Sequence, residues 1–118
     1  MYHSPASLSA EVNFSDIPLE EGTKWVEQFR WHSGLSFQNE CTYAGYEDVD
    51  NVAFIFCEKD KTISPEFQQK MIDDAEAARK RTGRDEIRVY KIDSGHIPIF
   101  SKPQELADLV EMAVGDMK

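Results

Sequence analysis

The chain has 118 residues, of which 41% are hydrophobic and 30% charged, and its 13 Lys and Arg against 22 Asp and Glu give a formal net charge of −9. This length fits one domain that buries roughly 65% of its unfolded surface, so we expect a folded core. The negative charge excludes nucleic acids and anionic membranes as leading partners, because both are bound through clustered Lys and Arg.

No membrane association is expected from the hydropathy of the chain. The longest apolar run, residues 52–57, is far shorter than the about 20 residues that a spanning helix needs. The first residues, MYHSP, have neither the basic nor the apolar region of a secretory signal, so we expect a cytoplasmic location. Cys41 and Cys57 are too few for a disulfide framework, and we expect both to be free and buried.

The N-terminal part of the chain is predicted to form a surface layer, because residues 1–50 are strongly acidic. Residues 1–13 show no periodicity and are predicted to be a loose lead-in, with order beginning near Phe14. Asp16 is predicted to be the N-cap of a helix that runs to about residue 30. Residues 32–50 mix aromatic residues with glycine, which predicts short helical turns and a connector.

The next segment predicts a buried strand followed by a helix. Residues 52–57 are apolar at every position, as in a parallel strand covered on both faces. Ser64 and Pro65 are typical of a helix start, and Gly83 of a helix end. The apolar positions predicted to face the core of this helix are Phe67, Met71, Ile72, Ala75 and Ala78.

The last segment predicts a second strand and a final helix. Residues 86–92 alternate apolar and polar side chains, which is typical of a strand near a sheet edge. Ser101 and Gln104 have the spacing of a capping box and precede an apolar stripe over 106–114. The order of elements over residues 52–118 is therefore β-α-β-α. Two strands joined by such a helix pair in parallel through a right-handed crossover, so the predicted fold class is α/β.

Two residues with catalytic chemistry follow the two predicted strands. Asp60 comes three residues after the first strand, and His96 comes four residues after the second. Because active groups of α/β folds lie at the carboxyl ends of strands, we expect both side chains at one sheet edge and within hydrogen-bond reach. The carboxylate would then orient the imidazole. Taken singly, Asp60 is as compatible with a turn acid and His96 with a surface histidine.

Several segments resemble the C-terminal part of α/β-hydrolases, most closely the small esterase and hydroxynitrile-lyase-like branch and its fungal relatives. The similar segments are FCEKDK at 56–61, QQ at 68–69, SGHIP at 94–98 and FSKPQEL at 100–106, with weaker likeness in FSDIP at 14–18, KWV at 24–26 and TY at 42–43. The resemblance implies that Asp60 is the acid and His96 the base of a catalytic triad. It also implies a helical lid segment over 14–51, followed by the last βαβα unit of the domain over 52–118.

The nucleophile of that family has no counterpart in the sequence. Its G-x-S-x-G elbow needs two glycines four residues apart, whereas the 6 glycines here lie at 22, 34, 45, 83, 95 and 115. The same spacing excludes a P-loop and a dinucleotide fingerprint, and we expect no cofactor. A metal site of Asp60, Asp93 and His96 has no supporting motif, so none is expected. Trp25 is a candidate for substrate contact beneath a lid, or else a core residue.

Three interpretations of function stay open. The chain can be the C-terminal part of an esterase-like hydrolase of a small ester, whose nucleophile lies outside these residues. It can be an inactive remnant that acts as a binding module, or a truncated gene product without independent function. In each case the residues 52–57 lack covering elements, so we expect self-association or a partner chain on the exposed strand edge.

Overall fold

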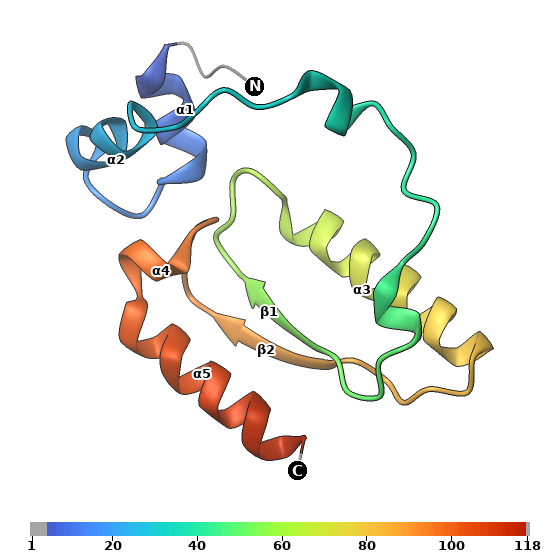
Figure 1. The fold of residues 1–118 in the computed structure, drawn as a ribbon. Coiled ribbons are helices and arrows are strands. Elements are labelled where there is room, and N and C mark those ends of the chain that lie inside the picture. The colour runs from blue at the N-terminus through green and yellow to red at the C-terminus, as the bar shows by residue number, and fades with distance from the viewer. Residues whose placement is uncertain (1–4, 118) are drawn as a thin grey trace.

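The computed structural model describes residues 5–117 as a helical hairpin, a long connecting strap and a small α/β unit (Figure 1). The hairpin and strap contain α1 (Ala6–Asn13), α2 (Leu19–Val26) and two short 3₁₀ helices, η1 (Gly34–Phe37) and η2 (Gly45–Glu47). The α/β unit contains β1 (Ala53–Cys57), α3 (Pro65–Arg81), β2 (Arg88–Ile92), α4 (Pro98–Ser101) and α5 (Pro103–Asp116).

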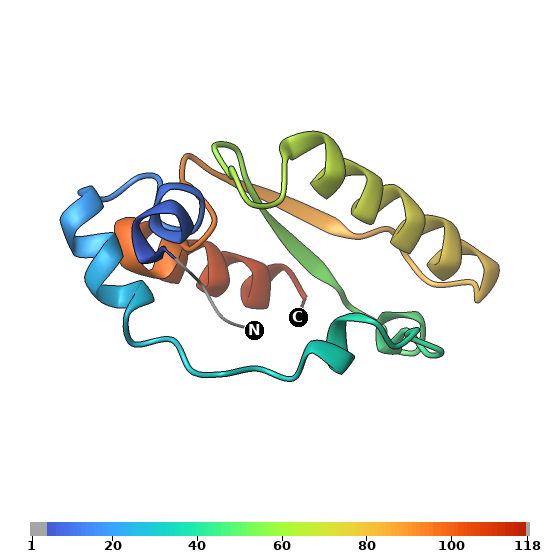
Figure 2. The same cartoon turned by 90° about the horizontal axis from the view of Figure 1, so that it is seen from above.

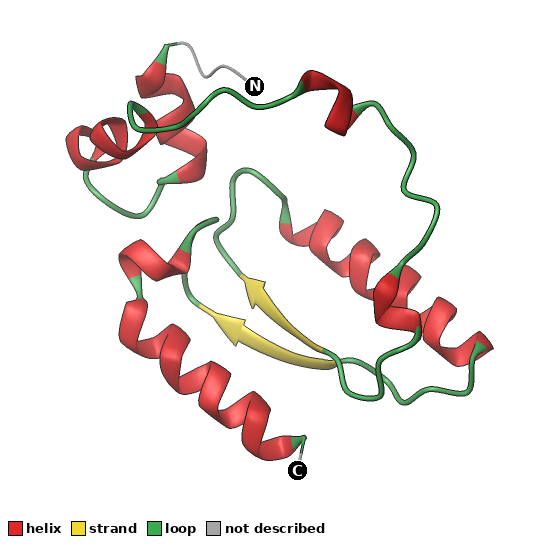
Figure 3. Ribbon diagram, viewed as in Figure 1, coloured by secondary structure: helices red, strands yellow, loops and turns green. Residues whose placement is uncertain are grey.

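The two strands pair in parallel, as the β-α-β order predicts, with Ala53 opposite Arg88 and Cys57 opposite Ile92. In two views at right angles, α3 lies on one side of the strand pair and α5 on the other (Figures 1 and 2). The predicted mixed α/β class is confirmed, while both strands are one or two residues shorter at their start than the apolar pattern indicates. The carboxyl ends of both strands lie at the same end of the sheet (Figure 3).

Helix α3 begins and ends as its sequence predicts. The Ser64 side chain accepts a hydrogen bond from the Phe67 backbone, and Gly83 takes a positive φ of 72° just after the helix. The buried face, however, is rotated relative to the prediction. Phe67 and Met71 are exposed, while the buried residues of the helix are Gln68, Ile72, Ala75, Ala78 and Arg79. Gln68 and Arg79, the two polar residues among them, form hydrogen bonds with backbone groups.

The Gln68 side chain forms hydrogen bonds with the outer edge of β1 at Cys57, the last residue of the strand. Its amide oxygen accepts from the Cys57 N–H at 2.9 Å, and its amide nitrogen donates to the Cys57 carbonyl at 2.9 Å. A third bond runs from the same nitrogen to the Ile63 carbonyl at 3.0 Å. A helix side chain thus satisfies the backbone groups that a neighbouring strand would otherwise pair, at a site where Gln68 is buried.

The prediction of a loose lead-in over residues 1–13 is wrong for its described part. Residues 6–13 form α1, which packs on α2 through a cluster of Ala10, Phe14 and Val26. Small side chains make this contact possible, since a Cβ added at Gly22 of α2 would lie 2.8 Å from the Cβ of Phe14. Helix α1 therefore owes its stability to tertiary packing, which a search for local periodicity does not detect. Residues 1–4 lie outside the described part of the chain.

Two predicted helix caps are also wrong, and for one shared reason. Asp16 does not cap α2, which begins at Leu19 after Pro18 and ends at Val26, and Ser101 does not cap α5, whose N-cap is Lys102. Instead the Ser101 hydroxyl donates to the Asp16 carboxylate at 2.5 Å. Both predicted caps are therefore wrong because the two side chains form a hydrogen bond with each other instead of with a helix N-terminus.

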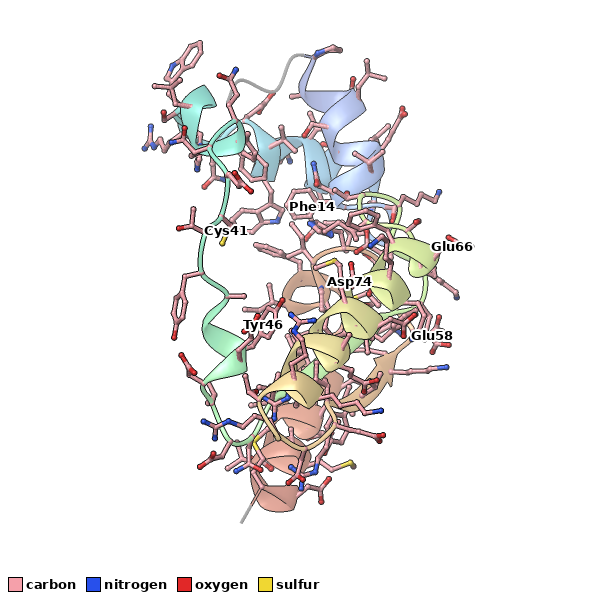
Figure 4. All side chains as sticks on the ribbon, turned by 90° about the vertical axis from the view of Figure 1, so that its right-hand side faces the viewer. Phe14, Cys41, Tyr46, Glu58, Glu66 and Asp74 are labelled. Carbon is pink, nitrogen blue, oxygen red and sulfur yellow. The ribbon has the colours of Figure 1, made fainter. Side chains whose placement is uncertain are left out.

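The strap between α2 and β1 is anchored at one end by a buried arginine. The Arg79 guanidinium donates to the carbonyls of Tyr46 at 2.7 Å, Val49 at 2.8 Å and Asp50 at 2.9 Å, and to that of Asp85 at 2.9 Å. Arg79 is 1% exposed. Figure 4 shows the strap, with Cys41 and Tyr46 labelled, running down one side of the molecule beside α3. Cys57 is buried as expected, but Cys41, on the strap, is exposed.

The chain is more extended than a domain of its length. Its radius of gyration is 16.3 Å, against about 13.5 Å for a compact domain of this size. Its accessible surface is 8304 Å², about 1,800 Å² more than the roughly 6,500 Å² of a compact monomer of equal mass. No helix within residues 5–117 is long and apolar enough to cross a membrane.

Candidate functional site

Two loops that leave the parallel strands carry the candidate site. Beyond the last strand pair, Glu58 N–H donates to the Ile92 carbonyl and Lys59 N–H to the Ser94 carbonyl, each at 3.0 Å. These bonds continue the ladder into both loops and hold them side by side. Asp60 and His96 follow directly, so the backbone brings them to the same sheet edge as the strand order predicts.

Asp60 and His96 form a hydrogen-bonded pair. The His96 Nδ1 lies 2.9 Å from Oδ2 of Asp60, which confirms the predicted proximity. Because a carboxylate only accepts hydrogen bonds, Nδ1 carries the proton of this bond, and in the neutral tautomer with that proton Nε2 is the basic nitrogen. Within residues 5–117, Nε2 has no hydrogen-bond partner, and the His96 side chain is 28% exposed. The ring therefore offers a free basic nitrogen to solvent.

The carboxylate of Asp60 is fixed from both sides. Its Oδ1 accepts from the backbone N–H groups of Thr62 at 2.8 Å and Ile63 at 2.9 Å, while Oδ2 faces His96. The Asp60 side chain is 4% exposed. Backbone donors and burial hold the acid in one orientation, so it can in turn orient the imidazole.

The loop before His96 is held by a residue from the helical hairpin. The Gly95 N–H donates to Oδ2 of Asp16 at 2.7 Å. A Cβ at Gly95 would lie 2.8 Å from the Ser15 hydroxyl and 3.0 Å from Oδ1 of Asp16, so any larger residue would have to displace these two side chains. Ser94, the preceding residue, is fully buried.

Charged and sulfur-containing groups near the pair have separate partners. Lys59 and Asp93 form an exposed ion pair at 2.8 Å, and this hydrogen bond raises the pKa of the lysine and lowers that of the aspartate. Asp93 thus points to a lysine, and no group of three or more potential metal ligands exists within residues 5–117. Burial raises the pKa of the Cys57 thiol, which keeps it protonated at neutral pH.

Trp25 lies near the loop that follows His96 without reaching the pair. Its ring centroid is 4.7 Å from that of Phe100, and the side chain is half-buried against the α1–α2 cluster. This placement fits the core interpretation, and a substrate contact by Trp25 stays a prediction. Sequence reasoning missed the supporting roles of Asn13 and Asp16, because their partners Thr62 and Gly95 lie far away in the sequence.

Two curated proteins are similar to this chain. Probable hydrolase R7 of Phoma sp. is 38% identical over 112 residues, which cover 94% of this chain and 44% of that protein. Methylesterase 9 of Arabidopsis thaliana is 36% identical over 76 residues, 64% of this chain and 26% of that protein. The chain thus spans less than half the length of either relative.

No protein-family model and no solved structure matches the chain. The names of the two relatives nevertheless agree with the chemistry of an acid that orients a histidine. Hydrolase and methylesterase are what these names say of those two proteins.

Proposed function

We propose that the chain supplies the acid and the base of an α/β-hydrolase that cleaves a small ester. The observation that supports this most directly is the 2.9 Å contact between His96 Nδ1 and Asp60 Oδ2 at the carboxyl ends of two parallel strands, with Nε2 left free. The hydrolase and methylesterase names of the two relatives point to the same reaction class.

In this proposal His96 moves one proton in each half of the reaction. Its Nε2 takes the proton of an attacking hydroxyl as the hydroxyl oxygen bonds to the ester carbonyl carbon. The imidazolium that forms is stabilised by the Asp60 carboxylate, which stays ionised. When the carbon–oxygen bond to the alcohol breaks, Nε2–H returns its proton to the leaving alkoxide. A water molecule then attacks the acyl intermediate with the same help from His96, and the carboxylic acid product is released.

The attacking hydroxyl is proposed to come from a polypeptide segment outside these 118 residues. The sequence contains no G-x-S-x-G elbow, and Probable hydrolase R7 has more than half of its length outside the matched region. Oxyanion donors would come from the same segment. The roughly 1,800 Å² of excess surface is consistent with a chain that packs against such a segment.

The test is a chimera in which this chain replaces the matching part of Probable hydrolase R7. We expect the chimera to hydrolyse a short-chain activated ester such as p-nitrophenyl acetate. The His96→Ala substitution should reduce kcat about 10⁶-fold, and Asp60→Asn about 10⁴-fold, because the asparagine favours the wrong imidazole tautomer.

The matched controls are His32→Ala and Asp93→Asn in the same chimera, since neither side chain touches the Asp60–His96 pair. Both should retain activity within about twofold. An unchanged rate in the His96→Ala chimera, or a chimera inactive beside an active parent hydrolase, would reject the proposed role.

The chain alone should not be a working esterase. Without a positioned nucleophile and oxyanion donors, His96 can act only as a general base on water, and we expect about 10²-fold acceleration or less. A purified sample should hydrolyse p-nitrophenyl acetate at about the rate of free imidazole at equal concentration. Saturable turnover that His96→Ala abolishes would instead mean that a side chain of this chain, or a bound water, is the nucleophile.

A further inference from the structure

We infer that the turn between α1 and α2, residues 13–17, positions the Asp60–His96 pair by holding the loops on both sides of it. The inference rests on the proposed function, because it assigns to this turn the alignment of the acid and the base. Two side chains three residues apart make the two contacts: Asn13 reaches the loop of the acid, and Asp16 reaches the loop of the base.

On the side of the base, Asp16 holds the residue next to His96. Its Oδ2 accepts from the Gly95 N–H at 2.7 Å and from the Ser101 hydroxyl at 2.5 Å. One oxygen thus ties together the start and the end of the segment 95–101. The position of the His96 backbone is set by this anchor, because Gly95 precedes it directly.

On the side of the acid, Asn13 holds the residue that orients Asp60. The Thr62 hydroxyl donates to Oδ1 of Asn13 at 3.1 Å, while the Thr62 backbone N–H donates to Oδ1 of Asp60 at 2.8 Å. The Asn13 amide is itself fixed, since it donates to the Ser9 carbonyl and hydroxyl at 3.0 Å. A chain of hydrogen bonds therefore runs from α1 to the acid.

Apolar contacts of the same turn make it a rigid support. Phe14, between the two polar residues, is 3% exposed and belongs to the hairpin core. Its ring centroid lies 5.3 Å from that of Phe100, in an edge-to-face arrangement, and Ile97 packs against the same cluster. The segment after His96 is thus held by its apolar side chains and the segment before it by Asp16, so a shift of the hairpin changes both loops together.

The test follows the Nδ1 proton of His96 by ¹⁵N-edited NMR in the full chain, a measurement that needs no turnover. Hydrogen-bonded to Asp60, this proton should exchange slowly with water. We expect its exchange rate to rise about tenfold or more in Asp16→Ala, which removes a charged acceptor, and about threefold in Thr62→Val, which removes only the hydroxyl. Asp16→Asn should restore most of the protection, since its amide oxygen can accept both bonds.

The control Asp108→Ala makes the same charge change on the exposed face of α5, where the carboxylate accepts a hydrogen bond from Gln104, and should leave the rate unchanged. If Asp16→Ala fails to fold, Thr62→Val decides, because it alters one exposed hydroxyl. Exchange as slow in both variants as in the parent chain would overturn the inference, and so would an unprotected His96 proton in the parent chain. If the His96 Nδ1 proton is protected but His96→Ala leaves ester hydrolysis by the chimera unchanged, the proposed function is rejected. The positioning of the Asp60–His96 pair by residues 13–17 then still holds.

Discussion

The Gln68 side chain binds three backbone groups, two of them buried, and each of them loses its partner if the amide is removed. An unpaired buried donor or acceptor costs about 1–3 kcal/mol, and part of this cost is relieved where water can enter. We therefore expect Gln68→Leu to lower the free energy of unfolding by about 2–4 kcal/mol, measured by urea denaturation.

Its neighbour Gln69 provides the matched control. Gln69 is exposed and, within the described part of the chain, its side chain donates only to Asp73 on the same helix, so Gln69→Leu should change the free energy of unfolding by less than about 0.5 kcal/mol. Equal midpoints of urea denaturation for the two variants would mean that the Gln68 amide does not stabilise the edge of β1.

At this scale the sequence predicts residues whose chemistry is tied to a strand end, and misses those defined by a distant partner. The proximity of Asp60 and His96 is predictable because parallel strands bring their carboxyl ends to one edge of the sheet. Asp16 carries the local signature of a helix N-cap, yet its carboxylate binds Gly95 and Ser101. Local spacing carries no information on a partner about 80 residues away, so the cap prediction failed.

Among the elements, the 3₁₀ helix η2 and the end of the strap make most of their side-chain hydrogen bonds to the α/β unit with Arg79, beside single contacts from Thr82 and Arg84. Among residues 5–117 Arg79 has no carboxylate partner and instead donates to four carbonyls, three of them within residues 46–50. Arg79→Met would keep most of the buried stem but leave these carbonyls unpaired. We expect a loss of about 2–4 kcal/mol and faster cleavage of residues 44–52 in limited proteolysis.

The control for this variant is Arg81→Met at the exposed end of the same helix. It removes an identical charge, so it distinguishes the loss of the Arg79–carbonyl hydrogen bonds from the general effect of losing one positive charge. Cleavage of the strap at equal rates in both variants would contradict the role of Arg79.

Elements with strong local signals were predicted well, and those formed by tertiary contacts were not. Ser64, Pro65 and Gly83 set the ends of α3, because caps and breakers act locally. Helix α1 has few large apolar residues and forms because Ala10 and Phe14 pack on Gly22 and Val26. The course of the strap follows from Arg79, whose sequence signal is that of an ordinary basic residue at a helix C-terminus.

For the molecule as a whole, the extra accessible surface has a consequence for assembly. A two-stranded sheet with an apolar strand leaves backbone groups and side chains that other chains can cover. We expect the isolated chain to associate at micromolar concentration, giving a mass above 13.5 kDa in light scattering. A monodisperse monomer that melts in one cooperative transition would contradict this expectation.

Gln68 also determines how far a third strand could extend along the sheet. Alternate residues of β1 direct their backbone groups away from β2, namely Ala53, Ile55 and Cys57. Because the amide already occupies Cys57, an incoming strand finds partners only at Ala53 and Ile55 and must stop there. Pairing at this edge would therefore end before the loop of Asp60, so the sheet can widen while the acid and its histidine stay uncovered.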